Sequence, residues 1–482
     1  MILALYIDAD TSAQTLGRPL LLGVGAVALA YAIMALALRS IHRGALVTAS
    51  LLIVLRAEGP EHVVVGTVLV ALVAAAYAWS ARIHRRPVTA RRATPFANSV
   101  TALLLVAVAI TGVANGRVVA TAHDLLRSSP GEPGPATTDA PSVLVLMLDG
   151  YPRADTVERL LGKSNDPFLT GLRERGFQVA DRSRSNYMYT SLTLSTMLHM
   201  RHIESIEGTA AGMRQVINDN PAFDMMRQRG YRVMTNAVPW VGVTLQSGDE
   251  YCGDGGVNDF EHHLLRSSLL MPIVETLNPS FLADRWRSYI DVAFDCSHEA
   301  ATGAGAEQRL IFAHVPAPHL PIVYQRDGQP APLRHYSDTR PELDITDAEF
   351  SDAYMSHLEY VNVRTLEVVD AMTSADRESI VVVLSDHGSE FGLNWLSGAD
   401  SDLDERFANL FAARTPGVPC LFGSSPTPVN LFTSLLRGYF SQAIPLLPDS
   451  QFVSDSTSPL DVELLQSQER SRTGCNEEGT GS

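Results

Sequence analysis

Two apolar runs that end abruptly in acidic or imidazole side chains constrain the fold of this chain more than any other feature. The first is S-V-L-V-L-M-L-D-G at 142–150, and the second is S-I-V-V-V-L-S-D-H-G at 379–388. A continuous apolar run is typical of a parallel strand buried on both faces, and parallel sheets place their chemistry just beyond the carboxyl ends of such strands. The sequence therefore predicts that Asp149, Asp386 and His387 meet at one edge of a large α/β domain.

Charge is divided unevenly along the 482 residues. Residues 1–120 contain ten Arg and four acidic residues, a net of +6, and because the whole chain carries −16, residues 121–482 carry −22. A basic, apolar N-terminal part joined to an acidic remainder is not the profile of a nucleic-acid-binding protein. We therefore expect a membrane anchor that carries a soluble domain, with the lipid bilayer as a partner and no nucleic acid.

Three apolar segments, at 19–38, 62–80 and 98–116, have the length of about 20 residues that a membrane-spanning helix needs. A shorter segment at 44–55 is either a fourth span or a re-entrant segment. The Arg-rich loop at 81–97 is expected to stay cytoplasmic, so the last span would deliver the rest of the chain to the extracytoplasmic side. A cleaved signal peptide is disfavoured because several apolar segments follow the first one.

The predicted organisation is a membrane domain of about four helices at 1–120, a Pro/Gly/Thr-rich linker at 121–141, a soluble domain at 142–458 and a disordered polar tail at 459–482. Strand-like runs alternate with helical stretches in the soluble domain. This alternation predicts an α/β fold with a central, mostly parallel sheet flanked by helices. The strands are expected at 142–149, 232–238, 309–315 and 380–385, and the helices at 153–162, 166–175, 191–202, 348–373 and 428–440.

The four cysteines have no C-x-x-C spacing that would indicate a metal site. Cys252 and Cys296 could form a disulfide if the domain lies outside the membrane, and free thiols are an equally good interpretation.

Several side chains at the predicted sheet edge suit divalent-metal chemistry. Asp149 is followed by glycine, and the sequence Asp386-His387-Gly388 places a carboxylate beside an imidazole, a ligand pair that suits Mn²⁺ or Zn²⁺. The alternatives are a strand-end turn for Asp149 and a structural role for the D-H-G sequence.

The segment N-Y-M-Y-T-S-L-T-L-S-T-M-L at 186–198 supplies a candidate nucleophile. Thr190 opens a predicted helix, where free backbone N–H groups and the helix dipole favour an attacking oxygen that faces a phosphate. Metal coordination would lower the pKa of this hydroxyl. The alternative is that Thr190 is an ordinary N-cap.

These motifs occur together in a known order. With P-H-L-P at 318–321 and D-E-R-F-A-N-L-F-A at 404–412, the chain resembles the sulfatase-like branch of the alkaline phosphatase superfamily over roughly 142–455. It resembles the membrane-anchored bacterial members, which include lipoteichoic acid synthases and lipid A phosphoethanolamine transferases.

The resemblance implies a role for each motif residue. Asp149, Asp386 and His387 correspond to metal ligands, and Thr190 corresponds to the nucleophile, which would also touch the metal and be transiently modified. His319 corresponds to the imidazole that binds a phosphate oxygen or protonates the leaving group. His314 could face the same site, although a satisfied core histidine is the favoured interpretation, and Asn186 either orients the nucleophile loop or forms a turn.

Two departures from the wider superfamily narrow the expected chemistry. Residues 186–198 lack the Cys and Pro of the segment that sulfatases convert to formylglycine, which disfavours sulfate-ester hydrolysis. His387 is the last histidine of the chain, so a second metal site with a late histidine is not expected. We therefore expect one divalent metal ion, Mn²⁺ or Zn²⁺, with Mg²⁺ or Ca²⁺ as further candidates.

The expected reaction is a two-step phosphoryl transfer by an extracytoplasmic domain on a bacterial plasma membrane. Thr190 would attack a phospholipid or related phosphodiester donor, His319 would assist the leaving group, and an acceptor hydroxyl on a glycan or lipid would then take the phosphoryl group. One alternative is a sulfatase-like hydrolase of phosphodiesters or sulfate esters, with water as the acceptor. The other is a catalytically inactive binding protein.

Overall fold

The computed structural model describes residues 13–39, 48, 140–203, 213–253, 261, 265, 271–303 and 307–468. The chain divides into two units, one formed by Met1–Arg117 with Gly255–Leu282 and the other by Val118–Asp254 with Ala283–Ser482. The first unit therefore includes residues 255–282, which the sequence analysis had assigned to the soluble domain. The sequence of this segment has no strand pattern, and the residues before and after it along the chain belong to the second unit.

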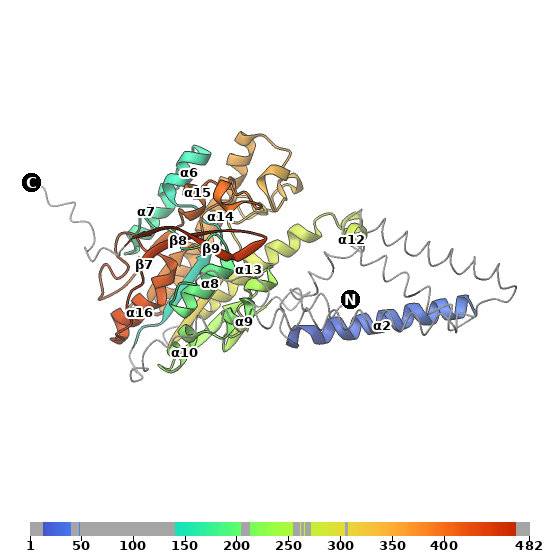
Figure 1. Cartoon of the computed structure of the whole chain (residues 1–482), viewed down its shortest axis with the longest axis horizontal. Coiled ribbons are helices and arrows are strands. Elements are labelled where there is room, and N and C mark those ends of the chain that lie inside the picture. The colour runs from blue at the N-terminus through green and yellow to red at the C-terminus, as the bar shows by residue number, and fades with distance from the viewer. Residues whose placement is uncertain are drawn as a thin grey trace, which may run out of the picture. The chain divides into compact units, whose positions relative to one another are not determined.

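Two helices represent the first unit among the described residues, α2 (Ala13–Ala37) and α12 (Met271–Leu277) (Figure 1). α2 covers most of the predicted span at 19–38, and Leu21 and Leu36 are exposed on it. Within the described ranges, no helix combines the length and the hydropathy that a membrane crossing requires. The predicted spans at 62–80 and 98–116 lie outside the described residues, as does 44–55 apart from Thr48.

A seven-stranded sheet organises the second unit, in the order β2-β7-β6-β1-β5-β3-β4. The central strand β1 pairs in parallel with β5 on one side and β6 on the other, and every residue of β1 is buried. β3 and β4 continue the parallel part, whereas β7 and β2 pair in antiparallel fashion. The strands are β1 (Val143–Leu148), β2 (Gln178–Val179), β3 (Arg232–Asn236), β4 (Glu250–Cys252), β5 (Arg309–Val315), β6 (Ile380–Leu384) and β7 (Phe411–Arg414).

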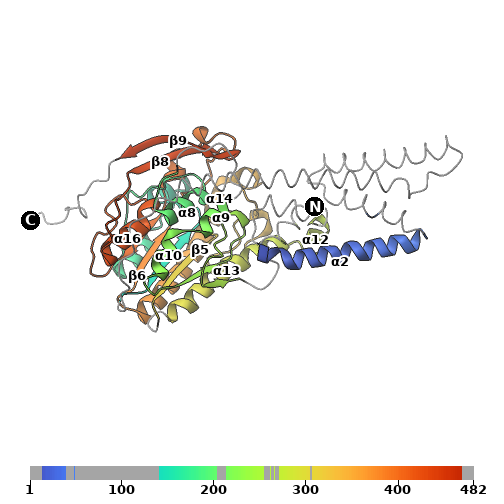
Figure 2. The same ribbon diagram turned by 60° about the horizontal axis from the view of Figure 1, so that its bottom comes forward.

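Helices cover both faces of this sheet and make a three-layer α/β fold, as the sequence predicted (Figures 1 and 2). Leu144, Leu146 and Leu148 of β1 pack in one core with α6, α7, α13 and α14, while Val143, Val145 and Met147 pack in the other with α8, α9, α10 and α16. Alternate residues of a strand point to opposite faces, so a continuous apolar run is required for burial on both. The helices are α6 (Ala154–Leu161), α7 (Asp166–Glu174), α8 (Thr190–His199), α9 (Met213–Asn218), α10 (Pro221–Arg227), α13 (Phe281–Thr302), α14 (Asp347–Ala375) and α16 (Leu431–Phe440).

A C-terminal hairpin extends the folded chain beyond the predicted boundary at residue 458. β8 (Asp449–Asp455) pairs with β9 (Ser458–Gln468), and Leu460 and Val462 of β9 are buried in a small core with Tyr187. The expectation of disorder from residue 459 is therefore wrong for the residues of β9, because alternating apolar residues give the strand one face to bury. Residues 469–482 lie outside the described residues.

A disulfide joins Cys252 at the end of β4 to Cys296 in α13, with 6.4 Å between the two Cα atoms. Of the two interpretations left open by the sequence, the disulfide is the one observed. It ties an edge strand to a helix that covers the sheet.

Candidate functional site

Three of the predicted ligands meet at the carboxyl edge of the sheet. Asp149 follows β1, and Asp386 and His387 follow the neighbouring strand β6. One ligand atom from each residue lies within 4.8 Å of the others. His387 Nε2 is 3.2 Å from Asp386 Oδ2 and 3.7 Å from Asp149 Oδ1, and all three side chains are buried. We call these residues the three-ligand cluster.

The unpaired atoms of this cluster fit a divalent cation. Asp149 Oδ1 and Asp386 Oδ2 are buried without a hydrogen-bond partner. His387 Nδ1 lies 2.8 Å from the Gly388 carbonyl oxygen, to which it donates, so the Nε2 lone pair faces the carboxylates. Burial, and next the charge of Arg406, lower the pKa of His387 to about 3, so its ring is neutral. Three converging lone pairs repel one another unless a cation lies between them.

The other carboxylate oxygens are held by hydrogen bonds that orient the cluster. His314 Nε2 lies 2.8 Å from Asp149 Oδ2, and Asp386 Oδ1 accepts from the Gly150 N–H at 3.2 Å. Gly150 has a φ of +66°, which glycine adopts without strain, and this turn aims its N–H at Asp386. His314 therefore contacts the site directly, whereas the sequence analysis favoured a core histidine without a role there.

Thr190 begins α8 and lies at the same cluster. Its Oγ1 is 3.3 Å from His387 Nε2, and the side chain is partly exposed. The N-cap of α8 is Tyr189, which makes no side-chain capping bond. Thr190 is therefore the first helical residue and not the N-cap, and its hydroxyl is directed to the cluster.

His319 lies beside the cluster in the loop after β5, between the cis prolyl bonds Ala317–Pro318 and Leu320–Pro321. Its backbone N–H donates to the Asp149 carbonyl at 3.0 Å, and its Nε2 is 3.1 Å from Glu390 Oε2. Burial favours the neutral ring, but the negative charge of Glu390 and the contact with it outweigh burial and raise the pKa of His319 to about 10. The side chain is therefore an imidazolium paired with a buried carboxylate.

Asn186 anchors the loop that leads to Thr190. Its side chain donates to the Ser450 carbonyl and accepts from the Val429 N–H, both at 2.9 Å, while its carbonyl accepts from the Phe452 N–H. Of the two interpretations of Asn186, an orienting role agrees with these bonds to β8 and to the segment before α16.

A short helix, α15 (Leu403–Phe407), connects the loops of the site. The Gly388 N–H donates to the Arg406 carbonyl at 2.7 Å, and Glu405 accepts from the Ser389 hydroxyl at 2.6 Å. A Cβ on Gly388 would lie 2.0 Å from the Glu405 carbonyl oxygen, so only glycine fits there. The glycine of the D-H-G sequence is therefore required by close backbone packing against α15.

Sequence reasoning missed Glu390 as the partner of His319, and it missed the link through α15. Glu390 stands three residues after His387, and a carboxylate so close to a ligand motif was the available signal. The contact of α15 with the nucleophile loop could not be predicted, because Arg406 and Met188 are more than 200 positions apart.

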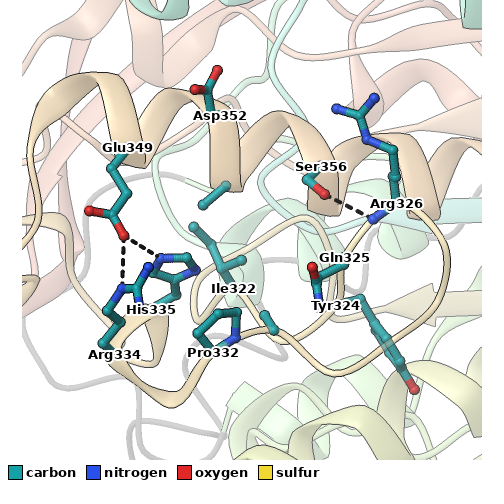
Figure 3. A pocket seen from close by; sticks show the side chains of 12 residues that line it. Ile322, Tyr324, Gln325, Arg326, Pro332, Arg334, His335, Glu349, Asp352 and Ser356 are labelled. Atoms are coloured by element: carbon teal, nitrogen blue, oxygen red, sulfur yellow. Dashed lines mark hydrogen bonds and ion pairs between the residues drawn. The ribbon is translucent and has the colours of Figure 1, made fainter.

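A separate pocket of about 580 Å³ lies between α14 and the loop at 322–335 (Figure 3). Glu349 is paired there with Arg334 and His335, at 2.8 and 3.0 Å. None of the cluster residues lines this pocket, so it is not part of the site described above.

Comparison with known proteins places the chain in a family. The family model described as "Sulfatase" matches residues 141–415, which is more than half of the chain. No curated protein sequence matches significantly.

Similar solved structures include the C-terminal periplasmic domain of EptC from Escherichia coli in complex with Zn (14% identity, covering 69% of this chain and 94% of that one, TM-score 0.40). Lipooligosaccharide phosphoethanolamine transferase A from Neisseria meningitidis is 16% identical, with coverage of 78% and 67% and a TM-score of 0.41. The 2-O glycosaminoglycan sulfatase BT1596 is 13% identical, with coverage of 64% and 72% and a TM-score of 0.43. The family match confirms the resemblance found in the motifs, and the chain belongs to the sulfatase family.

Proposed function

We propose that this protein is a metal-dependent phosphoryl transferase that uses Thr190 as a covalent nucleophile on a phosphodiester donor such as a phospholipid. The observation that carries the proposal is the position of the Thr190 hydroxyl, 3.3 Å from His387 Nε2 in the three-ligand cluster. Nucleophiles are activated where their proton is removed or their anion is stabilised, and a hydroxyl among metal ligands meets this requirement.

Asp149, Asp386 and His387 would hold one divalent cation, Mn²⁺ or Zn²⁺, with Thr190 as a further oxygen donor. When bound, the cation lowers the pKa of a neighbouring hydroxyl and withdraws negative charge from phosphoryl oxygens. The side chains of the protein orient the donor, transfer protons and exclude water.

In the first step, Thr190 Oγ forms a bond to phosphorus and releases its proton to solvent. The bond from phosphorus to the departing diacylglycerol oxygen breaks, and the His319 imidazolium donates its proton to that oxygen. In the second step, His319 takes the proton of an acceptor hydroxyl, which bonds to phosphorus as the bond to Thr190 Oγ breaks. Thr190 then regains a proton from water. Glu390 stabilises His319 in the form that can donate in the first step.

The compartment is part of the same proposal. We propose that residues 1–120 anchor the protein in the plasma membrane and that the catalytic domain lies outside the cytoplasm. The disulfide between Cys252 and Cys296 supports an extracytoplasmic domain, because such bonds persist in oxidising compartments. The three long apolar segments of the sequence support the anchor and would hold the site near a lipid donor.

Intact-protein mass spectrometry tests the proposal. The full chain in detergent is loaded with Mn²⁺ and incubated separately with phosphatidylglycerol and phosphatidylethanolamine. We expect an adduct with the mass of one headgroup phosphate, absent from Thr190→Ala and present in Ser191→Ala, which removes the neighbouring hydroxyl.

The other outcomes identify the alternatives. Lipid turnover that needs Thr190 but shows no adduct would indicate a hydrolase with fast release to water. Turnover that persists in Thr190→Ala would refute the nucleophile. A protein that binds no Mn²⁺ or Zn²⁺ and turns over no ester would be a catalytically inactive binding protein.

A further inference from the structure

We infer that Arg406 is a positioning residue for the Thr190 nucleophile, one that clamps the loop before Thr190 and keeps an unpaired positive charge beside the three-ligand cluster. The inference rests on the proposed function insofar as Thr190 is the nucleophile. The contacts that support it are independent of that role.

The guanidinium of Arg406 holds the carbonyl of Met188, two residues before Thr190. Arg406 is only 2% exposed, its Nε donates to the Met188 oxygen at 2.8 Å, and its Nη2 donates to the same oxygen. Two donors on one planar group fix the direction of that carbonyl more firmly than a single donor could. Because α8 begins at Thr190, this bond sets the approach of the chain into the first helical turn.

The backbone of Arg406 holds the other side of the site. Its carbonyl accepts from the Gly388 N–H at 2.7 Å, directly after His387. One residue therefore joins the loop of the nucleophile to the loop of two metal ligands, although these loops are about 200 residues apart in sequence. A shift of Arg406 would change the separation between Thr190 Oγ1 and His387 Nε2.

The charge of Arg406 lacks a carboxylate partner. Among the described residues, no Asp or Glu oxygen lies within 4.0 Å of its nitrogens, and its Nη1 is buried without a hydrogen bond. A buried, unpaired cation is costly and persists where nearby anions compensate for it.

A count of formal charges suggests what this cation favours. A divalent metal ion would neutralise Asp149 and Asp386, and His319 and Glu390 neutralise each other. Arg406 then adds a positive charge that attracts an anionic phosphoryl donor, while the neighbouring buried carboxylate of Glu405 offsets it in a count of formal charges. The cation should therefore favour donor binding and oppose metal binding.

The test compares three variants of the full chain in detergent. Arg406→Gln removes the charge and shortens the clamp, and Arg406→Lys keeps the charge. Arg229→Gln is the matched control, because Arg229 is 1% exposed and donates to the Met225 carbonyl at 2.6 Å but lies after α10, away from the cluster.

Two readouts do not depend on activity. Hydrogen exchange in the peptide containing residues 186–192 should accelerate in Arg406→Gln and stay unchanged in Arg229→Gln. Titration of the metal-free protein with Mn²⁺ at low ionic strength should show about fivefold tighter binding by Arg406→Gln, because a repelling charge is gone. Arg406→Lys should bind Mn²⁺ as the wild type does.

The direction of the change in Mn²⁺ affinity distinguishes a positioning role of Arg406 from a general loss of stability, which would weaken Mn²⁺ binding. Unchanged exchange in residues 186–192, or weaker Mn²⁺ binding by Arg406→Gln, would overturn the inference. Formation of the Thr190 adduct should slow at least tenfold in Arg406→Gln, and an unchanged rate would also overturn it. A further outcome is that the wild type forms no adduct while hydrogen exchange and Mn²⁺ binding change in Arg406→Gln as expected. That result would refute the proposed function and support the positioning role of Arg406.

Discussion

Replacing Asp386 by Asn should stabilise the metal-free protein and destabilise the metal-loaded protein relative to the wild type. In the wild type, Asp386 Oδ2 is buried without a hydrogen bond and lies 3.2 Å from His387 Nε2, whose lone pair faces it. The Asn amide oxygen can keep the bond from the Gly150 N–H, which places its NH₂ group where Oδ2 stood. The amide would then donate to His387, so that a repulsive contact becomes a hydrogen bond.

The size of the effect follows from general values. An unsatisfied buried acceptor costs about 1–3 kcal/mol, so we expect about 2 kcal/mol of added stability in the metal-free variant. With metal at 100 times its Kd, the wild type gains about 2.7 kcal/mol that the variant cannot gain once its ligand is lost. Without metal the variant is therefore the more stable protein, and with metal the wild type is.

Differential scanning fluorimetry of the full chain, in EDTA and in excess Mn²⁺, measures this reversal. One kcal/mol shifts the melting temperature by about 2–4 °C in domains of 150–250 residues and by less in larger ones, so a change of ~3 °C in EDTA is expected. Asp249→Asn is a suitable control, because Asp249 is bonded to Arg227 and the Val233 N–H away from the cluster. A variant less stable than the wild type in EDTA would refute the reasoning.

Three further changes probe the supports of the site. His314→Ala removes the bond to Asp149 Oδ2 and should weaken Mn²⁺ binding about tenfold in calorimetry, and unchanged affinity would exclude an orienting role. Gly388→Ala places a Cβ 2.0 Å from a carbonyl oxygen of α15 and should cost at least ~2 kcal/mol in denaturant unfolding, so a neutral result would contradict the packing. Since the charge of Glu390 raises the pKa of His319, the pair stabilises the fold fully below about pH 6.5, and this contribution disappears as pH rises through about 10. Glu390→Gln should therefore move the alkaline limb of the pH–rate profile to lower pH, and an unmoved limb would show that His319 is not the acid.

The sequence predicted the elements whose burial pattern is local. The strands at 142–149, 232–238, 309–315 and 380–385 are confirmed as β1, β3, β5 and β6, because a continuous apolar run can be buried on both faces only inside a sheet. The strand β7 was missed, and so was the helix α13, although its buried residues Trp286, Ile290 and Phe294 recur at helical spacing. The hairpin strand β9 was also missed, although Leu460, Val462 and Leu464 alternate with polar residues, which is the pattern of a half-buried strand.

The candidate site was predicted where strand ends carry its residues. Asp149, Asp386, His387 and Thr190 come together as expected, because β1 and β6 are neighbours. Their supports were missed: the one signal for Glu390 is its closeness to His387 in the sequence, and Arg406 acts through contacts that only the tertiary fold creates. No periodicity in the sequence indicates that a guanidinium reaches the Met188 carbonyl.

The anchoring of the nucleophile loop has a consequence for biosynthesis. Asn186 is bonded to Val429 and Ser450, and Tyr187 packs against Phe452, so the loop takes its shape from residues made more than 240 positions later. In a chain emerging during translation, β1 cannot pair with its neighbours β5 and β6 until they have been made, and the surroundings of Thr190 are not complete until β8 has been synthesised. Products that end before residue 449 would contain Thr190 and all three residues of the cluster, yet they would lack the contacts that hold the loop before Thr190 in place. The contacts around Thr190 can thus form only when nearly all of the sequence has been made.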